Sequence, residues 1–348
     1  MPTHVAYHLG TCARRLVSVP LTVVVAALAL VAVLLALVTA PLTALARQPW
    51  RLLRITTFLL VYACVDLAGV VAAFWFWAHC VLRPDPGQSK SQRLGEHSYE
   101  LLARLLDRLY RAAERIFELN LRVRPPVPQM GRAAAPLLVF ARHAGPGDSF
   151  LLLHALLCEA QVHPAVVLKR SLRWDPCLDM LIGRTPHVFV PSPAPETTTD
   201  AIANLAAALV PGEAAVIFPE GGNFTQQRRA RSISWLRRHG KARRASLAQQ
   251  RPHVLPPRWD GPLALLGGAA AGMDVVIVAH TGLDPMDTPS RIWRGIPLRA
   301  PVSATWWCVP GTAVPAGRAA AGEWLEQQWA RVDTWIDEES ERTGQLSA

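Results

Sequence analysis

Two long apolar stretches near the N-terminus constrain this chain more than any other feature. They cover Val19–Leu45 and Ile55–Leu82, and the basic link Arg47–Arg54 separates them. Each is longer than the roughly 20 residues that a helix needs to span about 30 Å of hydrocarbon. The first is too long for a signal-peptide core, and a second stretch follows it, so we expect no cleavage. The sequence therefore predicts a two-helix N-terminal membrane element.

The topology of this element stays open between two arrangements. A hairpin that spans the bilayer twice has to carry the basic link across it, whereas a hairpin half-inserted in the cytoplasmic leaflet does not. The acid Asp66 lies within the second stretch, and we expect it to face the partner helix or a polar pocket. We expect a location at the cell membrane, with the rest of the chain facing the cytoplasm.

Beyond Pro136, short apolar runs alternate with helical patterns. This alternation predicts an α/β fold with a largely parallel sheet flanked by helices. Ligand sites in such sheets lie beyond the carboxyl ends of the strands. The predicted strands are Leu137–Ala141, Ala165–Leu168, His187–Val190, Ala214–Phe218 and Val275–Ala279, and the predicted helices are Ser149–Ala160 and Ala201–Leu209.

A polar motif follows the first of these strands. His143 precedes Asp148 by five residues, and glycines 145 and 147 in the intervening segment let the backbone turn tightly. An acid bonded to one ring nitrogen of a histidine fixes the tautomer and makes the other nitrogen a general base. We therefore predict that His143 and Asp148 form a base able to take a proton from an alcohol. His280, which follows the last predicted strand, is a weaker candidate site residue.

The positive charge of the chain is concentrated in one segment. The formal net charge is +10, and ten basic residues with no acidic residue lie between Gly221 and Trp259. This patch suits an anionic partner such as phospholipid headgroups or a phosphorylated substrate. The alternative is a solvated basic loop. Nucleic acid is disfavoured, because no helix-turn-helix pattern occurs and aromatic residues are sparse in the patch.

A second motif, Phe218-Pro-Glu-Gly221, follows the fourth predicted strand. With the His143/Asp148 pair, it makes the chain resemble the glycerolipid acyltransferase family, which includes lysophosphatidic acid acyltransferases. The resemblance extends over Leu137–Asp284 and includes the segments Leu168–Pro176 and His253–Pro257. The two-helix N-terminal element is also typical of this family.

The resemblance implies a reaction and its site residues. His143 would deprotonate the hydroxyl of a lysophospholipid, most simply 1-acylglycerol-3-phosphate, which attacks an acyl thioester to give phosphatidic acid, while Asp148 orients His143. Glu220 and Gly221 would shape the acceptor site. The implied partners are membrane lipids, the lysophospholipid, and acyl-CoA or acyl carrier protein as thioester donor. No metal and no prosthetic group is required.

The chain departs from the family at the acceptor phosphate. The family often continues the second motif with Thr-Arg-Ser, but here Gly222-Asn-Phe224 follows. Guanidinium groups clamp phosphate bidentately, so we expect a substitute for the absent arginine. The candidates are Arg142, Arg170, Arg228 and Arg229.

Two other functions remain as alternatives. The chain is alternatively a membrane-tethered relative that binds anionic lipid without activity, or a GDS-type serine esterase using Ser149. The esterase needs a late Asp-x-x-His pair, which the sequence lacks.

The resemblance also divides the chain into domains. We predict a membrane anchor at 1–85, a connector with an amphipathic helix at 86–130, the catalytic domain at 131–300, and a C-terminal strand and helix at 301–348.

Overall fold

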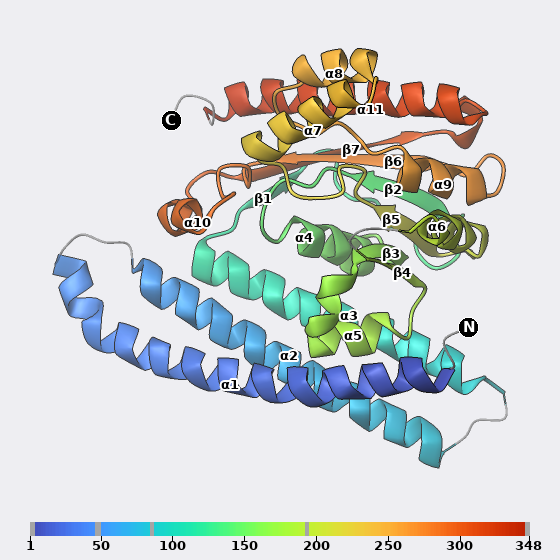
Figure 1. The fold of residues 1–348 in the computed structure, drawn as a ribbon. Helices are drawn as coiled ribbons and strands as arrows, with labels where there is room; N and C mark the ends of the chain where they lie inside the picture. Colours follow the sequence, from blue (N-terminus) through green and yellow to red (C-terminus); the bar gives the residue numbers. More distant parts are fainter. Residues whose placement is uncertain (1–3, 46–49, 84–86, 192–194, 345–348) are drawn as a thin grey trace. The chain divides into compact units, whose positions relative to one another are not determined.

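The computed structural model describes residues 4–45, 50–83, 87–191 and 195–344 (Figure 1). The chain divides into two compact units. The helical unit comprises residues 1–119 and 169–187, and the sheet unit comprises residues 120–168 and 188–348. These limits differ from the predicted domains, because a segment from the middle of the predicted catalytic domain belongs with the N-terminal helices.

The helical unit is built on three long helices. The first two are long and apolar enough to cross a membrane, over Gly10–Thr39 and Arg51–Leu82, as the apolar stretches predict. The third begins at the N-cap Ser89, whose hydroxyl accepts a hydrogen bond from Gln92 N at 3.2 Å. The elements of this unit are α1 (His4–Leu45), α2 (Arg51–Leu82), α3 (Lys90–Phe117), the 3₁₀ helix η2 (Arg170–Trp174) and α5 (Pro176–Ile182).

Buried polar contacts tie the segment 169–187 to α1 and α2. Asp179 of α5 is 2% exposed and accepts charge-assisted bonds from Arg14 at 2.6 Å and Arg15 at 2.8 Å. Asp66 of α2 accepts the backbone N–H of Cys177 at 3.2 Å. Asp66 therefore faces the first turn of α5, a polar partner of the kind that the sequence predicts. Removing α1 and α2 would leave Asp179 without two of its cationic partners.

The sheet unit contains a seven-stranded sheet in the order β1-β7-β6-β2-β5-β3-β4. Strand β2 pairs in parallel with β5 on one side and with β6 on the other, whereas β7 runs antiparallel to β6. The largely parallel sheet agrees with the prediction. The strands are β1 (Leu121–Val123), β2 (Leu137–Ala141), β3 (His163–Lys169), β4 (His187–Val190), β5 (Glu213–Ile217), β6 (Val275–Thr281) and β7 (Val302–Val309).

Alternation along the central strands separates the two faces of the sheet. Leu138, Phe140 and Ile277 belong to a core shared with Trp329 and other residues of α11. Figure 1 shows α7, α8 and α11 on one side of the sheet and α4 on the other. The helices of this unit are α4 (Asp148–His154) with the π-helical turn η1 (Ala155–Glu159), α6 (Thr197–Ala207), α7 (Gln226–Arg238), α8 (Ala242–Gln249), α9 (Asp260–Gly268), α10 (Pro289–Gly295), the 3₁₀ turn η3 (Gly311–Ala313) and α11 (Arg318–Arg342).

The arginine-rich segment folds into α7 and α8 and is not a solvated loop. Ile233 and Leu236 of α7 pack with buried alanines of α8. Part of its charge is neutralised by Glu326 of α11, which accepts from Arg244 at 2.8 Å and from Arg251 at 2.6 Å. The patch is therefore less basic than the sequence indicates, because α11 supplies acids that are distant in the chain.

Candidate active site

The loop between β2 and α4 carries His143 and Asp148. Gly147 adopts φ 87°, in the left-handed region that glycine tolerates, and the chain turns there into the first residue of α4. This turn brings the Asp148 carboxylate back to the imidazole, with Oδ2 at 2.9 Å and Oδ1 at 3.0 Å from His143 Nδ1. The predicted pair is therefore assembled, and His143 Nε2 is the ring nitrogen left to accept a proton.

Asp148 is held as a carboxylate by a dense set of donors. Its oxygens accept the backbone N–H groups of Ala144 at 2.8 Å, Gly145 at 3.2 Å and Ser149 at 2.6 Å. Burial alone would raise its pKa, but the hydrogen bonds and charges of His143 and His280 hold the pKa of Asp148 well below its usual range. An ionised Asp148 fixes the Nδ1–H tautomer of His143 and would stabilise the imidazolium formed when Nε2 takes a proton.

The second motif lies beside the first because β2 and β5 are adjacent parallel strands. The Phe218 ring packs against the His143 ring with centroids 4.7 Å apart. The His143 carbonyl accepts the N–H of Phe224 at 2.7 Å. The two motifs are 75 residues apart in sequence and in direct contact in the structure.

The two residues predicted to shape the acceptor site differ in exposure, since Glu220 is buried in this turn and Gly221 is exposed on it. Glu220 is 3% exposed, and its Oε1 accepts the indole N–H of Trp329 at 3.3 Å. Burial raises the pKa of Glu220 to about 8, against the opposing attraction of Arg142. Gly221 has φ 69°, and a Cβ there would lie 2.7 Å from Nε of Arg258. Glu220 therefore supports the turn from within, whereas the exposed Gly221 supplies its left-handed backbone conformation.

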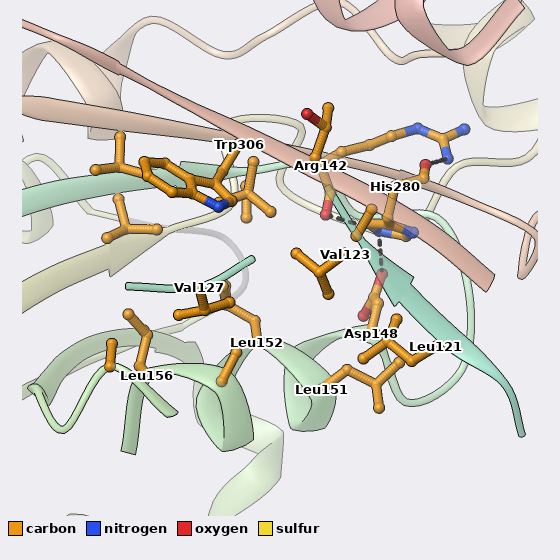
Figure 2. Close-up of a pocket in the computed structure, with 18 of the residues that line it drawn as sticks. Leu121, Val123, Val127, Arg142, Asp148, Leu151, Leu152, Leu156, His280 and Trp306 are labelled. Carbon is orange, nitrogen blue, oxygen red and sulfur yellow. Dashed lines mark hydrogen bonds and ion pairs between the residues drawn. The ribbon is translucent and has the colours of Figure 1, made fainter. Parts of the chain in front are cut away.

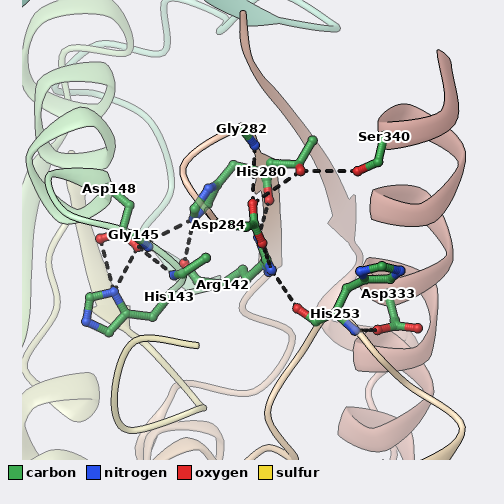
Figure 3. A network of polar contacts seen from close by, with 12 residues as sticks. Arg142, His143, Gly145, Asp148, His253, His280, Gly282, Asp284, Asp333 and Ser340 are labelled. Carbon is green, nitrogen blue, oxygen red and sulfur yellow. Dashed lines mark hydrogen bonds and ion pairs between the residues drawn. The ribbon is translucent and has the colours of Figure 1, made fainter. Parts of the chain in front are cut away.

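Arg142 is also a framework residue, which corrects its assignment to the acceptor phosphate (Figure 3). Its side chain is fully buried, its Nη1 donates to the His280 carbonyl at 2.6 Å, and its Nη2 donates to the His253 carbonyl at 2.5 Å and to Asp284. With these bonds made, the guanidinium ties the end of β2 to the loops after α8 and β6.

Two further candidates for phosphate binding have other places in the structure. Arg229 donates to the carbonyls of Ala248, Gln249 and Arg251 at 2.8–2.9 Å, so it caps the C-terminus of α8. Arg170 begins η2 in the helical unit. Within the sheet unit, the Arg229 guanidinium is thus occupied by backbone carbonyls, and Arg170 remains a candidate phosphate ligand by prediction alone.

Arg228 is the predicted arginine that lies at an open pocket next to the catalytic loop. Its side chain is exposed and donates to the Asn223 carbonyl at 3.0 Å. The pocket has a volume of about 820 Å³, and its lining includes Ala144 and Pro146 of the His143–Asp148 loop together with Arg228, Arg231 and Arg291. Asp287 also lines it and pairs with Arg291 at 2.9 Å. Arg231 and Arg291 were not predicted, since Arg291 comes from a remote helix that no motif marks.

Asp148 also lines an apolar cavity (Figure 2). Its volume is about 120 Å³, comparable to an engineered apolar cavity of about 150 Å³ that binds benzene. Figure 2 shows Asp148 and His280 at one end of it and Leu156 and Trp306 toward the other. The lining is otherwise almost entirely aliphatic, from β1, β2, α4, β6 and β7, including Leu121, Val123, Leu151, Leu152, Val276 and Val278.

Within the described ranges, no group of three or more His, Cys, Asp or Glu side chains is placed to hold a metal ion.

Comparison with known proteins identifies the domain that contains this loop. Residues 121–257 match the family model described as Acyltransferase. The match covers this segment of the chain and not the N-terminal helices. The match includes both motifs and confirms the family to which they pointed, although it begins at β1, earlier than the resemblance in the sequence.

One solved structure similar to the chain is the 1-acyl-sn-glycerophosphate (LPA) acyltransferase PlsC from Thermotoga maritima. The two share 14% sequence identity with a TM-score of 0.49, and the match covers 82% of this chain and 96% of that chain. No curated protein sequence matches the chain.

Proposed function

We propose that the protein transfers a fatty acyl group from an acyl thioester to the free hydroxyl of a lysophospholipid, with 1-acylglycerol-3-phosphate as the preferred acceptor and phosphatidic acid as the product. The observation that carries this proposal is the hydrogen bond of 2.9 Å between His143 Nδ1 and Asp148. The loop that carries this pair also contributes residues to an apolar cavity and to an arginine-lined pocket. The acyltransferase-family domain supports the reaction class.

His143 acts as the general base in this proposal. Its Nε2 takes the proton of the acceptor hydroxyl as the oxygen attacks the thioester carbonyl, and Asp148 stabilises the resulting imidazolium. The tetrahedral intermediate then expels the thiolate, the C–S bond breaks, and His143 returns the proton to sulfur. The products are an ester and a free thiol. No acyl-enzyme, metal or prosthetic group enters the sequence of steps.

The apolar cavity is the proposed site for the first part of the acyl chain. It begins beside Asp148 and His280 and is lined mostly by apolar side chains. Burial of methylene groups there is favourable by about 0.8 kcal/mol each. A chain anchored in the cavity would hold its thioester carbonyl near the His143 loop.

The pocket with Arg228, Arg231 and Arg291 is the proposed site for the phosphate of the acceptor. Ala144 and Pro146 also line it, so an anion bound to these arginines would hold its attached glycerol next to the loop that carries His143. Guanidinium groups suit this task, because they bind phosphate oxygens through two parallel N–H bonds. Arg228 thereby takes the place of the arginine absent after the second motif.

The location proposed for the reaction is the cytoplasmic side of the cell membrane. The two apolar helices support membrane association, and lysophospholipid acceptors reside in the bilayer. The thioester donor is coenzyme A or acyl carrier protein, both of which are water-soluble.

An assay of the purified full-length protein in detergent micelles tests the proposal. Labelled palmitoyl-CoA and palmitoyl-acyl carrier protein would be offered with 1-acylglycerol-3-phosphate, lysophospholipids with other headgroups, or glycerol 3-phosphate, and His143→Ala would serve as the control. We expect labelled phosphatidic acid as the main product. Release of free fatty acid without an acceptor would indicate the esterase, and binding to anionic vesicles without turnover would indicate a non-catalytic relative. Either result would overturn the proposal.

A further inference from the structure

His280 lies on the cavity side of β6, next to the active-site loop. Val276, Val278 and His280 alternate with Val275, Ile277 and Ala279, which face the core with α11. His280 is the polar member of the first set and is 8% exposed. A buried histidine at the end of an aliphatic row requires a polar partner.

The partners of His280 are the two ends of the loop that carries the proposed base. His280 Nε2 lies 3.2 Å from the Arg142 carbonyl and 3.5 Å from Asp148 Oδ2. Both of these atoms are acceptors, so Nε2 carries the ring proton and shares it between them. Its Nδ1 is buried and has no hydrogen-bond partner among the described residues, which leaves the Nε2 contacts as the polar attachment of this ring (Figures 2 and 3).

These contacts differ in kind from the other donors to Asp148. The N–H groups of Ala144, Gly145 and Ser149 belong to the same loop and helix as Asp148, so they move with it. His280 belongs to β6, which is held between β2 and β7 in the sheet. It therefore fixes the carboxylate, and the peptide just before His143, to a rigid strand.

We infer that His280 is a positioning residue, which holds Asp148 and the start of the loop so that His143 presents Nε2 to the acceptor hydroxyl. This inference rests on the proposed function. Its physical basis is that proton transfer is sensitive to geometry, since a misplacement of about 1 Å can cost about 100-fold in rate. The role requires an N–H donor at the position of Nε2, and not an imidazole as such.

Two variants of similar size separate this role from simple core packing. His280→Leu removes the donor and keeps an apolar side chain in the cavity wall. His280→Gln keeps an amide N–H at nearly the same reach from the backbone. Because Asp148 retains its loop donors, we expect His280→Leu to lower kcat about 10-fold, with the KM of donor and acceptor within about twofold of wild type. His280→Gln should stay within about threefold of wild type.

A neighbouring substitution controls for damage to the strand. Thr281 is 3% exposed, and its hydroxyl contacts Asp284 Oδ2 at 3.2 Å and Ser340 Oγ at 3.3 Å. Thr281→Val should lower the melting temperature and leave kcat unchanged. If His280→Leu does not fold, His280→Met, which also lacks a donor and adapts to its surroundings, replaces it in the comparison.

The outcomes distinguish this inference from the proposed function. An active wild type whose kcat is unchanged in His280→Leu, or falls equally in the Leu and Gln variants, overturns the positioning role and leaves the acyltransferase proposal standing. A change confined to KM also overturns it. A folded wild type that transfers no acyl group to any acceptor overturns both. A selective loss of kcat in the Leu variant, restored in the Gln variant, supports the inference.

Discussion

Asp148 Oδ2 lies 2.9 Å from His143 Nδ1 and also 3.5 Å from His280 Nε2, so one buried carboxylate is placed between two imidazoles. The two histidines are unlike in exposure, since the side chain of His143 is 16% exposed and that of His280 is 10% exposed. His143 comes from the loop and His280 from the sheet. His143 is the more exposed of the two, as its proposed role as the base requires.

His143→Ala should reduce acyl transfer at least about 1000-fold while the protein remains folded. The substitution removes the proposed base from a loop, where no core packing depends on it, and general bases contribute about 100- to 10,000-fold. The measurement is kcat with 1-acylglycerol-3-phosphate, with circular dichroism and thermal unfolding as controls. Retention of more than a few per cent of activity would exclude His143 as the base.

Asp148→Asn should lower kcat at least about 100-fold with a smaller effect on KM. The amide is close in size to the carboxylate, but it no longer attracts the Nδ1 proton or stabilises an imidazolium, and loss of such a carboxylate is severe in related catalytic pairs. Steady-state kinetics of the variant beside His143→Ala measures this effect. Near-normal kcat would mean that the hydrogen bond to His143 serves the loop and not the reaction.

Arg228→Ala should weaken acceptor binding, whereas Arg229→Ala should destabilise the protein. Arg228 lines the pocket, so its loss should lower kcat/KM for phosphorylated acceptors about 10-fold, the low end for a charge-assisted contact because this side chain is exposed and screened. Arg229 caps α8 through three carbonyls, so its loss should lower the melting temperature instead. Steady-state kinetics and thermal unfolding of both variants test this distinction. Equal losses of kcat/KM in the two variants would contradict it.

Leu156 variants should change the preference for acyl-chain length. Leu156 and Trp306 lie toward the end of the cavity away from Asp148 (Figure 2). Leu156→Phe reduces the space available and should favour shorter donors, whereas Leu156→Ala enlarges it and should favour longer ones. The ratio of kcat/KM for decanoyl-CoA and palmitoyl-CoA measures the change. If this ratio is the same in Leu156→Phe, Leu156→Ala and wild type, the acyl chain does not reach this end of the cavity.

The sheet and the contact between His143 and Asp148 were predictable because local patterns specify them. The apolar run Leu137–Ala141 coincides with β2, and His187–Val190 coincides with β4. The sequence placed both motifs after predicted strands, and the pairing of β2 with β5 brings the His143 loop and the Phe218 turn together. The match of residues 121–257 to the Acyltransferase model agrees with both motifs.

The roles of the arginines were not predictable, because their partners are remote in sequence. Arg142 and Arg229 are both occupied by backbone carbonyls that become available only when loops pack together. Glu220 was similarly assigned to the acceptor, but Trp329, which is 109 residues away, turns it into the interior. A sequence pattern shows that a charge exists, whereas its availability depends on which acceptors the fold brings to it.

The buried Glu220 leads to a prediction about stability and pH. Burial raises its pKa to about 8 from an ordinary value of 4.5. A carboxyl group with a raised pKa binds its proton more tightly in the folded state than in the unfolded state. Its contribution to stability is therefore fully present below about pH 4.5 and is lost progressively as the pH rises toward 8.

Glu220→Gln should remove this pH dependence. The amide oxygen can still accept the Trp329 N–H, and the variant has no carboxyl group to ionise inside the protein. The melting temperature of the variant relative to wild type should therefore rise steadily between pH 5 and pH 8, measured by thermal unfolding in detergent. The exposed residue Glu338 of α11 supplies the control Glu338→Gln, for which the difference from wild type should stay constant. A melting-temperature difference that stays constant for Glu220→Gln as well would show that Glu220 is ionised in the folded protein throughout this range. An acid that is charged in both the folded and the unfolded state does not make stability depend on pH.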